Sequence, residues 1–89
     1  MFDQEIKEIM DLTLRVNNET EHAVFFYYSG HVEILRVIVA ESKINYDNDL
    51  YSVDTYVTPR TFIDKDEIQS NLYKIIHELK ALLEVTENV

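Results

Sequence analysis

The residue types that most often perform chemistry in proteins occur in this sequence, but not at the spacings that chemistry requires. A zinc-hydrolase helix needs two histidines one turn apart with a glutamate after the first, and His77-Glu78 is followed at the required position by Ala81. His22 and His31 lie at the start of an expected strand and in an expected turn, where a structural or solvated role is the ordinary one. The sequence therefore predicts no metal site.

A calcium loop and a phosphate-binding loop are also incomplete. Asn45, Asp47 and Asp49 have the spacing with which a calcium loop begins, but Leu50 replaces its glycine and Tyr56 its bidentate glutamate. The single glycine of the chain allows no phosphate-cradling loop, and no serine is flanked by glycines. Carboxylate pairs carry little information among seventeen acids. We expect no cofactor and no enzymatic activity, with an unrecognised enzyme as the remaining alternative.

The composition is typical of one small folded domain spanning residues 1–89. Hydrophobic residues make up 46% of the chain, and the absence of cysteine excludes disulfides and thiolate sites. The N-terminus has no basic region before an apolar stretch, and no apolar run approaches the ~20 residues that span a bilayer. These features favour a cytoplasmic protein.

Hydrophobic periodicity predicts an α+β fold of one helix, a three-stranded antiparallel meander and a long C-terminal helix, with both helices on one face of the sheet. Asp3 is the expected cap of the first helix, and Asp64 with Glu67 resembles a capping box for the last, which could also break in two. The expected elements are a helix from Asp3 to about Val16, strands His22–Tyr28, Val32–Val39 and Tyr51–Thr58, and a helix Ile63–Val85.

The only glycine predicts the hairpin between the first two strands. If Gly30-His31 forms a type II′ turn, Ser29 pairs with Val32 and Phe26 pairs with Leu35. The side of the sheet that carries Phe26 is the more aliphatic one, so it should meet the helices. The first-helix stripe is Phe2, Ile6, Ile9, Met10, Thr13 and Val16, and the central expected contact packs Leu72, Ile76 and Leu79 against Val24, Phe26, Leu35 and Val37.

Seventeen acidic residues against eight Lys and Arg give a net charge of −9, which repels nucleic acids and anionic membranes. The first two expected strands are neutral, and the acidic excess lies on the first helix and around the loop before the third strand. There the carboxylates of Glu41, Asp47, Asp49 and Asp54 could imitate spaced phosphates and occupy a basic groove of a partner protein. The alternative interpretation is an ordinary solvated loop whose charge keeps the protein soluble.

The outward face of the sheet is expected to be aromatic. Aromatic residues together with arginine are enriched at interface hot spots, and an exposed patch of this kind usually marks a contact. The expected partner or dimer face consists of Phe25, Tyr27, Ile34, Arg36 and Tyr56. If the register were displaced by one residue, these side chains would instead belong to the core.

The stretch Phe26-Tyr27-Tyr28-Ser29-Gly30-His31-Val32 is followed by an alternating strand, an acidic loop, another strand and a Leu-rich helix. Over residues 22–85 this layout resembles small acidic proteins encoded by phages and prophages of Gram-positive bacteria. In size, acidity and element order the chain is also similar to phage anti-CRISPR inhibitors that imitate DNA.

The resemblance implies an intracellular, phage-encoded inhibitor that blocks a host nucleic-acid-binding protein through its acidic surface. The net charge of −9 separately predicts that the chain contacts neither nucleic acid nor membrane itself. The alternative function is a small structural or assembly module that forms a homodimer through the exposed face of its sheet.

Overall fold

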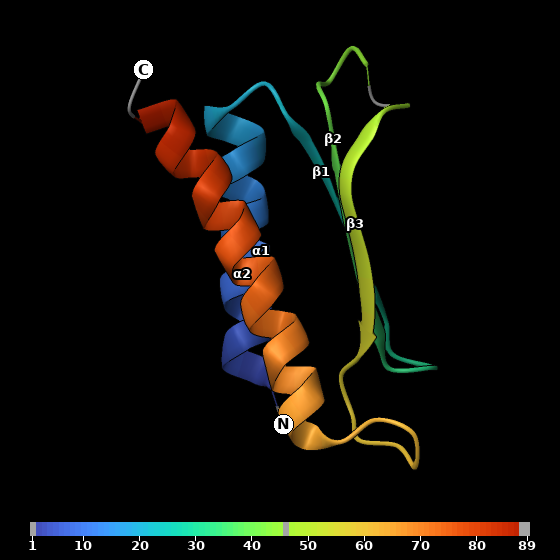
Figure 1. Cartoon of the computed structure of the whole chain (residues 1–89). Helices are drawn as coiled ribbons and strands as arrows, with labels where there is room; N and C mark the ends of the chain where they lie inside the picture. The colour runs from blue at the N-terminus through green and yellow to red at the C-terminus, as the bar shows by residue number, and fades with distance from the viewer. Residues whose placement is uncertain (1, 46, 88–89) are drawn as a thin grey trace.

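The chain adopts the helix, meander and helix order that its sequence predicts. The computed structural model describes residues 2–45 and 47–87 and contains α1 (Asp3–Glu19), β1 (Ala23–Ser29), β2 (Ile34–Ala40), β3 (Asp49–Tyr56) and α2 (Lys65–Glu87). The strands form one antiparallel sheet in the order β1-β2-β3. Both helices lie on one face of this sheet, and within the described residues no helix covers the other face (Figure 1). The predicted α+β architecture is confirmed.

Helix α1 begins and ends differently from the expectation. Asp3 is its first helical residue and not its cap, because the N-cap position is taken by Phe2, which makes no side-chain capping hydrogen bond. The buried ring of Phe2 instead anchors this end of the helix in the core. The helix also continues to Glu19, a turn beyond Val16, and ends where the Thr20 hydroxyl donates to the Val16 carbonyl at 2.8 Å.

The hairpin between β1 and β2 has a four-residue loop, residues 30–33, and not the predicted two-residue type II′ turn. Ser29 therefore pairs with Ile34, two residues further along than expected. The glycine of the loop has no positive φ, and the left-handed residue is Glu33, with φ 57°, whose carbonyl accepts the N–H of Val57 at 2.9 Å. Because a shift of two residues preserves the side on which every side chain points, the predicted faces are correct although the register is wrong.

A single hydrophobic core fills the space between the helices and the inner face of the sheet. Leu72, Ile76 and Leu79 of α2 belong to it together with Leu35 and Val37 of β2, as predicted. In α1, Leu12 is buried while Met10 is 48% exposed, so the predicted stripe is displaced by part of a turn. The buried hydrophobic residues are Phe2, Ile9, Leu12, Val16, Val24, Leu35, Val37, Val39, Ala40, Val57, Ile68, Leu72, Ile75, Ile76, Leu79 and Leu83.

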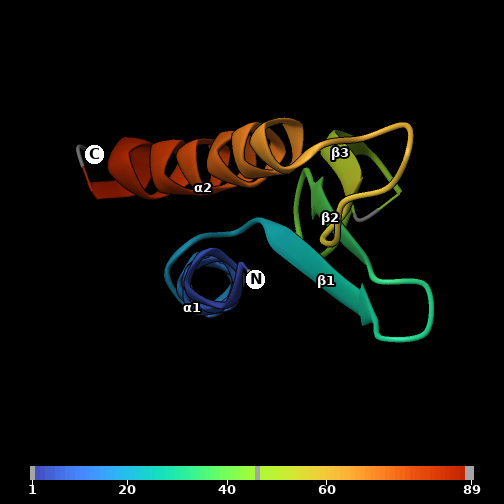
Figure 2. The same ribbon diagram turned by 90° about the horizontal axis from the view of Figure 1, so that it is seen from below.

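Helix α2 is continuous, and its start follows the predicted capping pattern. The Asp64 carboxylate accepts the backbone N–H of Glu67 at 2.8 Å, and Ile63 packs against the core. Helix α2 lies beside α1 and contacts β3, whereas α1 contacts β1 (Figure 2). The helices run in the same direction, so both C-terminal ends lie at the end of the molecule that holds the β2–β3 loop (Figure 1).

Candidate protein-interaction surface

The uncovered outer face of the sheet carries all five residues that the sequence assigns to a contact surface. Strand pairing places one residue of each strand in every row across this face. The rows are Phe25, Ile38 and Ser52, then Tyr27, Arg36 and Asp54, and finally Ser29, Ile34 and Tyr56. Tyr27 is 55% exposed and Phe25 is 37% exposed, so these aromatic rings remain accessible in the single chain.

The middle row contains an ion pair that makes the face electrically neutral. A guanidinium nitrogen of Arg36 donates to the Asp54 carboxylate at 3.1 Å, and both side chains are more than half exposed. An exposed pair of this kind contributes little to stability, about 0 to 1 kcal/mol. Its consequence is local charge balance in a chain whose net charge is −9.

A two-residue turn extends the aromatic surface beyond β3. The backbones of Arg60 and Ile63 exchange two hydrogen bonds, which leaves Thr61 and Phe62 at the tip of the turn. The ring of Phe62, 68% exposed, meets Tyr56 edge to face with centroids 5.2 Å apart. The Arg60 guanidinium lies 5.5 Å from the centre of the Tyr56 ring, within the range of a cation–π contact. The position of the Tyr56 ring is thus fixed by Phe62 and Arg60.

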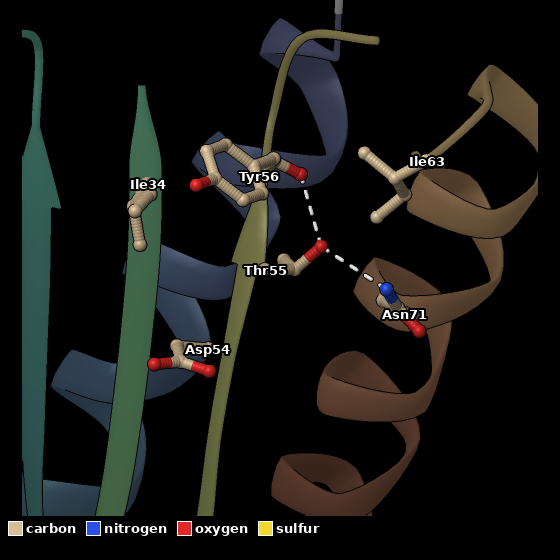
Figure 3. Close-up of a pocket in the computed structure, with 6 residues that line it drawn as sticks. All are labelled: Ile34, Asp54, Thr55, Tyr56, Ile63 and Asn71. Carbon is tan, nitrogen blue, oxygen red and sulfur yellow. Dashed lines mark hydrogen bonds between the residues drawn. The ribbon is translucent and has the colours of Figure 1, made fainter. Parts of the chain in front are cut away.

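Two shallow pockets flank this surface. One, of about 400 Å³, is lined by residues of the hairpin and its neighbouring rows, including Tyr27, Ile34 and Arg36. The other, of about 280 Å³, lies between β3, the following turn and α2, and Figure 3 shows the Thr55 hydroxyl at its centre. That hydroxyl donates to the Tyr56 carbonyl at 2.9 Å and accepts from the Asn71 amide at 3.1 Å. The bond from Asn71 links β3 to α2.

The four predicted acidic residues do not form one array. Glu41 and Asp47 lie on the β2–β3 loop and Asp49 begins β3, so three acids share one end of the molecule. Asp54 lies five residues beyond Asp49 along β3, which separates the two residues by roughly 17 Å. It points to the outer face and binds Arg36. The carboxylate of Glu41 accepts a hydrogen bond from the Asn48 side chain at 2.9 Å.

The acidic end also contains the C-terminal ends of both helices, where backbone carbonyls concentrate partial negative charge. Neither helix has a basic residue in its last turn, as far as the chain is described. Lys43 provides a local counter-charge, because its ammonium donates to the carbonyls of Asn17 at 2.6 Å and Thr20 at 2.9 Å. This lysine closes the end of α1 and ties the acidic loop to it.

The three histidines lie apart from one another in the described ranges. His22 binds the Glu41 carbonyl at 2.8 Å, His31 and His77 are exposed, and no group of three or more His, Asp and Glu side chains is placed to hold a metal ion. Burial, and secondarily the Glu78 carboxylate, raises the pKa of the Tyr51 phenol. Among the described helices, none combines the length and apolar character needed to cross a membrane.

Two contributors to the outer face were missed in the sequence. Ile38 follows Ile34 and Arg36 at the strand period of two, so alternation alone would have identified it. Phe62 lies in a short loop without periodicity, and only the three-dimensional structure reveals its contact with Tyr56.

Comparison with protein-family models, with curated protein sequences and with solved structures found no match to this chain.

Proposed function

We propose that this chain is a small non-enzymatic assembly module that binds a second copy of itself through the outer face of its sheet. The observation that carries the proposal is the meeting of Phe25, Tyr27, Ile34, Arg36 and Tyr56 on a face that no described helix covers. In a soluble domain, uncovered aromatic surface of this kind is usually a contact surface.

The charges of the face favour a second copy as the occupant. Arg36 and Asp54 are neighbours on β2 and β3, so a two-fold axis parallel to the strands and between them exchanges their positions. In a face-to-face dimer built on that axis, Arg36 of each copy lies over Asp54 of the other. Such a contact is isologous and closed, as in most homodimers. Elsewhere the net negative charge is screened within about 8 Å at physiological salt.

The size of the face sets the expected strength of the contact. On this axis β2 and β3 of the two copies lie over one another and β1 lies at the margin, so two strands about 4.8 Å apart and about 23 Å long give a contact roughly 10 Å wide by 23 Å long. The area buried over both copies is therefore below the lower end of the range for stable complexes, about 1,200 Å². The dimer should accordingly be weak, with a dissociation constant in the micromolar range or above.

A charge-exchange experiment tests this proposal. Arg36→Asp places two acids on the face and Asp54→Arg places two bases there, so each variant alone should be monomeric in sedimentation velocity at concentrations where the wild type dimerises. An equimolar mixture of the two should form a heterodimer, because each Arg then meets an Asp of the other copy. Tyr56→Ala, which removes an aromatic ring of β3 from the contact, should weaken the wild-type dimer. A wild type that remains monomeric at 1 mM, or a mixture that remains monomeric, refutes the proposal.

A second candidate function uses the acidic end. Its support is the gathering of Glu41, Asp47 and Asp49 beside the C-terminal ends of both helices, which together give concentrated negative charge. This arrangement suits a phage-encoded inhibitor of the anti-CRISPR kind that occupies the basic groove of a nucleic-acid-binding protein.

The test for this candidate is competition with duplex DNA for an RNA-guided nuclease of a Gram-positive host. Replacing Glu41, Asp47 and Asp49 with Gln, Asn and Asn should reduce competition and its dependence on salt, whereas Asp54→Asn is the matched control on the sheet face. Unchanged competition by the triple variant, or no competition by the wild type, removes this candidate.

A further inference from the structure

At the free edge of β1, a side chain from α1 makes the hydrogen bonds that a neighbouring strand would make. The Asn17 carboxamide of α1 donates to the Val24 carbonyl at 3.0 Å and accepts the Val24 N–H at 2.8 Å. These are the two hydrogen bonds that a peptide group of an adjoining strand would make. Because they bond to Asn17, the N–H and C=O groups of Val24 point away from β2.

The backbone groups of two further residues point in the same direction. In an antiparallel pair the outward-pointing positions alternate along a strand, so the N–H and C=O of Phe26 and Tyr28 face the same free edge as those of Val24. We call the two hydrogen bonds between Asn17 and Val24 the clasp between α1 and β1. Among the described residues, no side chain or backbone group makes such bonds to Phe26 or Tyr28 on this edge. The second half of β1 therefore presents backbone donors and acceptors to an incoming strand.

An apolar groove lies directly beside this edge. It measures about 390 Å³ and is lined by Ile6 and Met10 of α1 and by Phe26 and Tyr28 of β1, with Asp3 and Lys7 at its margin. Met10 and Tyr28 are 48% and 50% exposed. A strand added at the edge would direct every second side chain into the groove, because side chains alternate between the two faces of a sheet.

The two edges of the sheet differ in their protection. Charged residues and bulges on an edge strand hinder the addition of another strand. β3 carries Asp49 and Asp54 and has a register irregularity opposite Val39 and Ala40. β1, from Ala23 to Ser29, contains no charged residue, no proline and no irregularity in its pairing.

Charge complementarity defines the occupant. The side chains that line the groove balance each other, with one acid (Asp3) and one base (Lys7), but the chain as a whole has a net charge of −9 and therefore attracts a basic segment. We propose that the β1 edge binds an extended basic peptide segment of a partner protein as a fourth strand. In this segment apolar side chains alternate with Lys or Arg, the apolar ones entering the groove. The site is separate from the outer face, so it does not depend on the proposed dimer.

A synthetic peptide is the direct probe. An octapeptide alternating Leu or Val with Lys should bind the full-length chain. In NMR spectra of the protein, the backbone amide cross-peaks of Phe26 and Tyr28 should shift when the peptide is added. A peptide of the same composition with its Leu and Val in one block, and a peptide with Glu in place of Lys, should each bind at least tenfold more weakly. N-methylation of the alternate amides that face β1 should abolish binding, whereas N-methylation of the other amides should have a smaller effect.

Two protein variants separate this site from the dimer. Met10→Glu places a charge in the groove and should reduce peptide affinity at least tenfold, while Leu14→Glu, at an exposed position of the same helix, should not. Arg36→Asp, which is designed to break the dimer, should bind the peptide as well as the wild type does. Equal binding of the alternating and blocked peptides, or cross-peak shifts confined to the outer face, overturns the proposal. Protection of the Phe26 and Tyr28 amides in the free wild type that disappears on dilution would assign the edge to a second copy and also overturn it.

Discussion

Replacing Asn17 with alanine should measure the contribution of the clasp between α1 and β1. The substitution removes two partly buried hydrogen bonds to the backbone of Val24. Each typically contributes about 0.5 to 1.5 kcal/mol, so the loss is about 1 to 3 kcal/mol. Alanine is the better helix former by about 0.5 kcal/mol, which offsets part of that loss. The expected decrease in the free energy of unfolding is therefore about 0.5 to 2.5 kcal/mol, against about 5 to 15 kcal/mol for a typical domain.

Urea titration followed by circular dichroism supplies the measurement, with an unchanged slope showing that the unfolded state is the same. Asn17→Asp retains an acceptor for the Val24 N–H but sets a carboxylate oxygen against the Val24 carbonyl, so it should be at least as destabilising as alanine. Asn18→Ala, at the exposed neighbouring position, is the control and should change stability by less than about 0.5 kcal/mol. Equal effects at the two positions, or an unchanged hydrogen-exchange rate of the Val24 amide in Asn17→Ala, would refute the reasoning.

Three further predictions follow from burial. Leu79→Ala should cost about 2 to 5 kcal/mol in a thermal or urea melt because its side chain is fully buried, whereas Leu14→Ala, 62% exposed, should cost less than about 0.5 kcal/mol. Phe26→Ala should destabilise the dilute monomer more than Phe25→Ala, since only Phe26 packs against the core; equal melting temperatures would contradict the assigned faces. The raised pKa of Tyr51 means that the unfolded chain loses this proton first as pH rises, so stability should fall from about pH 10 upward to the folded-state pKa, and Tyr51→Phe should reduce that fall in melts across the range.

The sequence predicts which face each strand residue occupies more reliably than it predicts which residues are paired. Alternation with a period of two places Phe26, Leu35 and Val37 inward as long as the predicted register differs from the true one by an even number of residues. Loop length itself depends on Glu33, whose left-handed backbone is held by its bond to Val57 on a distant segment. A contact of this kind is not encoded in the local sequence, which predicts the left-handed turn residue at Gly30 whereas the structure has it at Glu33.

Helix ends show the same division between local and distant causes. The Asp64 cap of α2 is formed within one turn and was predictable from sequence. The last turn of α1 is held by Thr20 at its own end and by Lys43 from the β2–β3 loop, and the second of these requires the folded structure.

The composition of the outer face could be predicted from the sequence, whereas the arrangement of the acidic residues could not. The outer-face residues belong to regular strands, and their common location follows from periodicity. The acidic residues lie partly in a loop, so their number was visible but their separation was not: Asp54 faces Arg36 across the sheet, away from the other three.

The uneven distribution of charge disfavours open-ended assembly of a chain that has an open sheet face and a free strand edge. If the β1 edge of one copy joined the β3 edge of the next, the contact would be heterologous and could extend into a fibre. β3 opposes that contact through Asp49, Asp54 and its pairing irregularity. The outer face instead places Arg36 beside Asp54, which suits a two-fold contact that closes after two copies. Acidic residues thus restrict the proposed association to surfaces that cannot propagate, and the uncharged β1 edge remains available for a strand of different origin.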